Sequence, residues 1–167
     1  MSADRLYTPW RMKYITGEKK REGCVFCNDF ETNTALDRAN YLIYRGAHTF
    51  TVMNIYPYNV GHLMVLPHEH VGTLVETPIA AQHEMMTISA YFTELLGRMM
   101  RPDGFNLGLN IGRAAGSGID THLHFHIVPR WNGDSNFLPV VGSTRILPEE
   151  LVDTYDKIVA AMKVTPP

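Results

Sequence analysis

The chain has 167 residues, of which 45% are hydrophobic, and its formal net charge at pH 7 is −2. This size and composition fit a single globular domain, and the lack of a basic excess excludes a protein that binds the phosphate backbone of nucleic acids. No apolar run approaches the roughly 18 residues of a membrane span and no signal-peptide core follows the start, so we expect a cytoplasmic protein without nucleic acid or membrane partners.

The first 23 residues are polar and aromatic, and they end in a run of charged residues. Such a run is typical of a solvated segment, so we expect residues 1–23 to form an N-terminal arm and residues 24–167 to form one domain. Within the arm, Trp10 beside Arg11 is expected either to pack onto the domain or to stack on a nucleotide.

Cys24 and Cys27 are the only cysteines, and they form a CxxC motif. From the residues alone, this motif is a redox pair, half of a metal site or a chance spacing. A thioredoxin-like redox pair requires a βαβ context, which the surrounding sequence does not have. A zinc site requires four ligands, so two further ligands would have to come from elsewhere in the chain.

Hydrophobic periodicity predicts four strands and one helix before a glycine-rich loop. Short apolar runs at 41–44 and 49–53 predict a β-hairpin, and a turn-rich segment precedes a third strand at 62–66. Pro78 opens a long helix whose apolar residues follow helical spacing, and a Pro and a Gly end it. Alternating apolar residues at 105–109 predict the fourth strand.

After the loop, three histidines alternate with three bulky apolar residues. Successive side chains of a strand point to opposite faces, so a strand at 122–129, with Pro129 as its terminator, places all three imidazoles on one side. Leu123, Phe125 and Ile127 then face a core. Because imidazole acts as nucleophile, acid, base or metal ligand near neutral pH, this row predicts a reaction centre.

Two chemistries can use the row of histidines. In the first, the central His124 attacks an electrophilic phosphorus while His122 and His126 hydrogen-bond the phosphate or protonate the leaving group. In the second, the three imidazoles chelate a catalytic zinc with water in the open position. The loop from Asn110 to Thr121 is rich in glycine, whose backbone N–H groups can converge on an anion, and beside the histidines it favours phosphate.

These elements predict an α+β fold. We expect a five-stranded, mostly antiparallel sheet with the long helix on one face, followed by a C-terminal amphipathic helix at about 148–163. The histidine strand is the fifth, antiparallel to the fourth across the glycine-rich loop. His48, His68 and His83 belong to no motif, and we expect them at the surface.

The stretch from His122 to Val128 resembles the His-φ-His-φ-His-φ-φ signature of the histidine triad (HIT) superfamily, in which φ is an apolar residue. The likeness covers about residues 24–130 and includes, in the order that the family shows, Asn54, Gly61, His62, Val65, Pro67 and the loop from Asn110 to Gly118. Two further segments, 9–11 and 133–145, resemble the branch that contains bacterial diadenosine tetraphosphate phosphorylases and related hydrolases. The loop between Asn110 and His122 is one residue longer than in the fragile-histidine-triad and nucleoside-phosphoramidase branches.

The resemblance implies nucleotidyl transfer or hydrolysis on adenosine polyphosphates such as diadenosine tetraphosphate, through a covalent nucleotidyl intermediate on His124. Phosphate or water is then the acceptor, Asn54 contacts a ribose hydroxyl, and His62 helps to order the site. The expected phosphate-binding residues are Asn110, Gly116, Ser117, Gly118 and Arg145. A nucleoside phosphoramidase-type hydrolase and a non-catalytic nucleotide-binding or scaffold protein are the alternative functions.

The resemblance also implies a structural zinc and a partner subunit. Some HIT proteins, and the related galactose-1-phosphate uridylyltransferases, hold zinc with a CxxC motif, a histidine after the third strand and the first histidine of the triad. The matching residues here are Cys24, Cys27, His70 and His122. No catalytic metal is then required at the triad. HIT homodimers join their sheets continuously, which implies a ten-stranded sheet for this chain.

Overall fold

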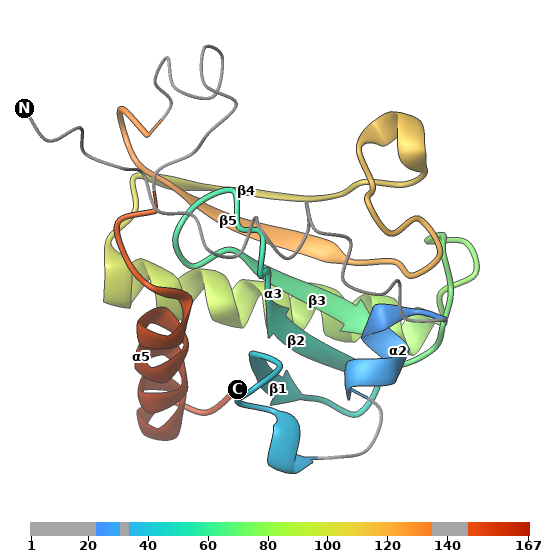
Figure 1. The fold of residues 1–167 in the computed structure, drawn as a ribbon, viewed down its shortest axis with the longest axis horizontal. Coiled ribbons are helices and arrows are strands. Elements are labelled where there is room, and N and C mark those ends of the chain that lie inside the picture. Colours follow the sequence, from blue (N-terminus) through green and yellow to red (C-terminus); the bar gives the residue numbers. More distant parts are fainter. Residues whose placement is uncertain (1–22, 31–33, 135–146) are drawn as a thin grey trace, which may run out of the picture.

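The computed structural model describes residues 23–30, 34–134 and 147–167, which build a five-stranded sheet with helices on both of its faces (Figure 1). The order across the sheet is β1-β2-β3-β5-β4, and every neighbouring pair is antiparallel. The strands are β1 (Leu42–Arg45), β2 (Thr49–Met53), β3 (Leu63–Pro67), β4 (Gly104–Leu109) and β5 (Phe125–Arg130). The predicted α+β class with an antiparallel sheet is therefore confirmed.

The long helix α3 (Ile79–Met100) runs along one face of the sheet, and the C-terminal helix α5 (Leu151–Val164) packs beside it (Figure 1). The Tyr155 hydroxyl ties α5 to the sheet by donating to the carbonyl of Leu42 at 2.9 Å. Short helices are α2 (Val25–Phe30), η1 (Thr34–Leu36) and η2 (Arg113–Ala115). Within the described part of the chain, no helix combines the length and the hydropathy that crossing a bilayer requires.

The two faces of the sheet bury different sets of residues, because side chains alternate along each strand. The core on the α3 side contains Met53, Leu63, Val65, Leu123 and Ile127 from the sheet and its approach, and the core on the α2 side contains Phe26, Leu42, Phe50, Val52, Met64 and Leu66. His126 pairs with Met64 across the strands. His126 therefore lies on the α2 side, opposite the face that α3 covers.

The histidine strand is shorter than the predicted 122–129, because β5 begins only at Phe125. The ladders with β3 and β4 both stop at Phe125, and before it the chain lies beside the loop that follows β3, where the Leu123 N–H donates to the carbonyl of Val71 at 2.7 Å. At its other end the strand continues through Pro129 to Arg130. Pairing with β3 stops at Ile127, so among the described strands Pro129 pairs only with β4. Proline is tolerated at a position that is paired on one side only, because it has no N–H to donate to a second strand.

Candidate active site and metal centre

Four histidines gather on the α2 side of the sheet. His126 belongs to β5, His62 comes directly before β3, and His122 and His124 lie in the segment that leads into β5. All four side chains are buried. Leu123 and Ile127 belong to the core under α3, so the predicted separation of imidazoles from apolar side chains is observed.

Hydrogen bonds fix the tautomers of the His62–His126 pair. The Tyr58 N–H donates to Nδ1 of His62 at 3.0 Å, so in the neutral ring the proton is on Nε2. Nε2 of His62 lies 2.9 Å from Nδ1 of His126 and donates to it. The proton of neutral His126 is therefore on Nε2. Burial, with a smaller contribution from His124, lowers the pKa of His126 to about 4, which keeps the ring neutral at pH 7.

His124 has the opposite tautomer. Its Nδ1 lies 2.8 Å from the backbone carbonyl oxygen of His122, and because a carbonyl only accepts, Nδ1 carries the proton. Nε2 of His124 is then left with a free lone pair. The rings of His124 and His126 lie edge to face with centroids 4.9 Å apart. The site thus places a nucleophilic nitrogen beside an N–H donor, which suits attack on a phosphorus whose oxygens accept a hydrogen bond.

Asn54 and Tyr58 complete the surroundings of His62. The Asn54 carboxamide accepts from the Tyr56 N–H at 2.8 Å, and its nitrogen lies 3.4 Å from Nδ1 of His62. The Tyr58 ring lies against His62 and His126, with centroid separations of 4.7 and 5.8 Å. The sequence did not single out Tyr58. Its signal was an aromatic residue in the turn-rich segment before His62, a pattern that does not distinguish it from Tyr56.

The glycine-rich loop adjoins the triad at both of its ends. The amide nitrogen of Asn110 lies 3.4 Å from Nε2 of His126. Because this ring nitrogen carries a proton, we assign the amide in the flipped orientation, with its oxygen accepting the Nε2–H. The N–H groups of Gly116 and Ser117 donate inside the loop, to carbonyls at 3.0 and 3.4 Å. Like several other N–H groups of this loop, the Gly118 N–H donates to none of the described residues. Arg145, expected to bind phosphate, lies outside the described residues, as does Trp10.

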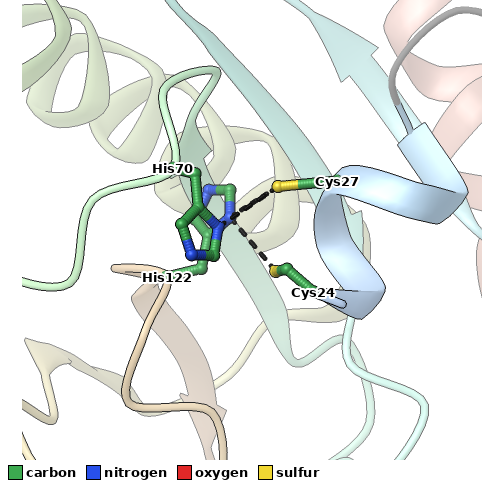
Figure 2. A group of neighbouring side chains, drawn as sticks. All are labelled: Cys24, Cys27, His70 and His122. Atoms are coloured by element: carbon green, nitrogen blue, oxygen red, sulfur yellow. Dashed lines mark hydrogen bonds between the residues drawn. The ribbon is translucent and has the colours of Figure 1, made fainter. Parts of the chain in front are cut away.

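The four predicted metal ligands come together around His122, the first histidine of the triad (Figure 2). Cys24 directly precedes α2 and Cys27 lies in its first turn, the loop after β3 supplies His70, and the segment before β5 supplies His122. All four donor atoms lie within 4.8 Å of one another. Nδ1 of His122 lies 3.5 and 3.6 Å from the two sulfurs, and Nδ1 of His70 lies 3.3 Å from Cys27 Sγ.

This donor set fits zinc. Two thiolates and two imidazoles are the ligands of a closed tetrahedral site. Nε2 of His122 donates to the carbonyl of Pro67 at 3.0 Å, which leaves Nδ1 unprotonated and turned toward the sulfurs, as a metal ligand requires. Burial is the largest cause that lowers the pKa of His122, and the hydrogen bond to Pro67 opposes it. The neutral ring at pH 7 is the form that binds a metal ion.

Other candidate positions lie apart from this centre. His48, His68 and His83 are exposed, as predicted for surface residues. A cavity of about 700 Å³ opens between the end of α3 and the start of α5, with Trp131 in its wall. None of the predicted site residues lines this cavity, so it is separate from the triad.

Comparison with known proteins agrees with this geometry. The family model of the HIT domain matches residues 37–133. An "AP-4-A phosphorylase" of Mycobacterium tuberculosis is 37% identical over 155 residues, which make up 90% of this chain and 80% of that protein.

Solved structures share the fold. A zinc-bound histidine triad family protein from Mycobacterium smegmatis has a TM-score of 0.65 and 26% identity, over 85% of this chain and 94% of that one. A hypothetical histidine triad nucleotide-binding protein from Sulfolobus tokodaii has a TM-score of 0.62 and 26% identity, over 84% and 90%. By its signature, its fold and its matched domain, the chain belongs to the histidine triad (HIT) domain family.

Proposed function

We propose that the protein transfers a nucleotidyl group from adenosine polyphosphates of the diadenosine tetraphosphate kind, through a covalent intermediate on His124. The observation that carries this proposal is the opposite tautomers of two neighbouring rings: Nε2 of His124 is a free acceptor and Nε2 of His126 is a donor. The 37% identical relative named AP-4-A phosphorylase supports the substrate class.

In the first step, Nε2 of His124 attacks the α-phosphorus, an N–P bond forms, and the P–O bond to the polyphosphate breaks. His126 is neutral, and its Nε2–H, shared with the Asn110 amide oxygen, hydrogen-bonds the phosphate oxygens rather than giving up its proton. The polyphosphate leaves as an anion, which needs no acid. The modified His124 ring carries a positive charge, and its Nδ1–H keeps the bond to the His122 carbonyl, which stabilises that charge.

In the second step, the acceptor attacks the phosphorus from the opposite side and the N–P bond breaks, which restores the lone pair of His124. Inorganic phosphate yields ADP without any net proton transfer, whereas water yields AMP and must lose a proton. The chemistry of a neutral His126 therefore favours phosphate as the acceptor. The Gly118 N–H and Asn110 are the proposed contacts of the transferred phosphoryl group, and Asn54 that of the ribose.

Zinc and a second subunit belong to the same proposal. Zinc would bind Cys24, Cys27, His70 and His122 and hold these segments together. The outer edge of β4 has no partner strand within the described sheet, and Leu107 on it is 46% exposed. Antiparallel pairing of two β4 edges would join two sheets into one of ten strands. Cysteines kept as thiolate ligands also suit a cytoplasmic protein, where thiols stay reduced.

The test is incubation of the purified protein with diadenosine tetraphosphate, with and without inorganic phosphate. Release of ADP and ATP only when phosphate is present identifies a phosphorylase, and release of AMP and ATP identifies a hydrolase. A trapped adenylyl group on His124, labile to acid and stable to alkali, supports the covalent route. His124→Asn should abolish the adduct, and exposed His83→Asn is the matched control that should retain it.

Other functions predict other outcomes. A zinc ion chelated by the triad would support turnover without any histidine adduct. A nucleotide-binding scaffold would bind adenine nucleotides and show no turnover to lose in His124→Asn. Sensitivity to chelators does not separate these cases, because His122 belongs both to the triad and to the cysteine centre. The adduct on His124 is therefore the decisive measurement.

A further inference from the structure

The helix that carries the cysteines also reaches the nucleophile. Phe26 lies between Cys24 and Cys27 in the sequence, and its side chain is buried in the core on the α2 side of the sheet. Its ring contacts two histidines of the triad: the centroid lies 5.6 Å from that of His122 and 5.7 Å from that of His124. A residue of α2 therefore packs against the nucleophilic ring.

His122 connects the same two sites through its own atoms. Its imidazole Nδ1 is turned toward the sulfurs of both cysteines, and its backbone carbonyl accepts the Nδ1–H of His124. The group that fixes the tautomer of the nucleophile thus belongs to a metal ligand. A shift of His122 away from the cysteines would move this carbonyl as well.

The short helix depends on these attachments. α2 has six residues, fewer than an isolated helix needs to be stable in water. Burial of the Phe26 ring offsets only part of the entropy lost when these residues are ordered, and thiolate bonds to a metal would supply the remainder. The order of α2, the position of Phe26 and the position of the His122 carbonyl are therefore expected to change together.

We propose that Phe26 is a positioning residue for the nucleophile, and that through Phe26 and His122 the cysteine centre holds His124 in its reactive orientation and tautomer. The activity part of this inference rests on the proposed function. The metal centre is then more than a structural cross-link, because the chain uses it to set the geometry of the residue that forms the covalent bond. Phe26 acts through His124 and contacts no substrate in this scheme.

The experiment compares Phe26→Ala and Phe26→Leu with the wild-type protein, all loaded with zinc. In Phe26→Ala, we expect formation of the adenylyl-His124 adduct in a single turnover to slow by about tenfold or more, with KM for diadenosine tetraphosphate within about twofold of wild type. Phe26→Leu refills most of the volume and should recover most of the rate. Val52→Ala is the control for core stability: it removes buried apolar atoms from the same core, but Val52 has no ring that could pack against His124. It should leave the adduct rate unchanged.

Two spectroscopic readouts separate positioning from general damage. Replacement of zinc by Co²⁺ should give the same tetrahedral thiolate spectrum in wild type and Phe26→Ala, which shows an intact metal centre. Nitrogen-15 NMR at pH 8 should show a single Nδ1–H tautomer for His124 in the wild type and a mixture of tautomers in Phe26→Ala.

A wild-type adduct rate and a single tautomer in zinc-loaded Phe26→Ala would overturn the inference. An equal loss of rate in Val52→Ala would also overturn it, because the effect would then come from core stability alone. If the wild type itself forms no adduct and shows no turnover, the proposed function fails. In that case the His124 tautomer in wild type and Phe26→Ala still decides whether Phe26 positions the ring.

Discussion

Acidification is expected to destabilise the protein through His126. Burial lowers the pKa of this ring to about 4 in the folded chain, from an ordinary value of 6.5. Below pH 6.5 the unfolded chain therefore binds a proton that the folded chain does not, so stability is complete above that pH and declines as the pH falls toward 4. Between pH 7 and pH 4.5, the two pKa values give a loss of about 2.4 kcal/mol in the free energy of unfolding.

The assay is urea unfolding of the wild type and His126→Asn across this pH range. Asparagine does not titrate, so the difference in stability between the two proteins should shrink by about 2.4 kcal/mol from pH 7 to pH 4.5. All other titrating groups, the metal ligands included, are shared and cancel in the comparison. Exposed His83→Asn is the control and should follow the wild type. Parallel stability curves for the wild type and His126→Asn would refute the reasoning.

Three further predictions concern the metal centre, the loop and the histidine pair. Cys27→Ser replaces a thiolate by a poor zinc ligand, and titration against a chromophoric chelator should show zinc affinity lower by at least about a hundredfold. Gly116 has a φ of +91°, so Gly116→Ala should lower the free energy of unfolding by about 1 kcal/mol, whereas Gly108→Ala, in open space without a positive φ, should not share this loss. His62→Leu leaves the buried Nδ1 of His126 without its donor and should destabilise by about 2 kcal/mol in chemical unfolding, and His62→Gln, which can still donate, should restore part of this. Unchanged zinc affinity in Cys27→Ser would contradict the assignment of Cys27 as a ligand. An equal loss of stability in Gly116→Ala and Gly108→Ala would contradict the role of the positive φ, and an equal loss in His62→Leu and His62→Gln would contradict the role of the donor.

The pattern of alternation predicted the sheet and its two faces, because strand geometry is local. Leu123 and Ile127 lie in the core and the imidazoles lie on the other side, as the period of two requires. The limits of β5 were less predictable, since they depend on where its ladders with β3 and β4 stop. Pro129 stays in the strand because its pairing there is with β4, a fact that no neighbouring residue reveals.

The contents of the site were only partly predictable for the same reason. The residues alone left the CxxC motif with several interpretations, and only the fold brings His70 and His122 to it. Tyr58 and Phe26 were not singled out, because the contact of Tyr58 with His126 and the contacts of Phe26 with His122 and His124 join segments that are far apart in the sequence. Long-range contacts of this kind leave no periodic signal.

The position of β5 between β3 and β4 has a consequence for folding. The last strand of the sheet enters its interior, so neither β3 nor β4 obtains this neighbour until Arg130 has left the ribosome. A nascent chain that stops before this point would expose a buried strand edge, the kind of surface that chaperones and other unfolded chains recognise. Closure of the sheet and assembly of the histidine cluster are therefore the same late event, and truncated products of this gene would lack the assembled cluster and be prone to aggregate.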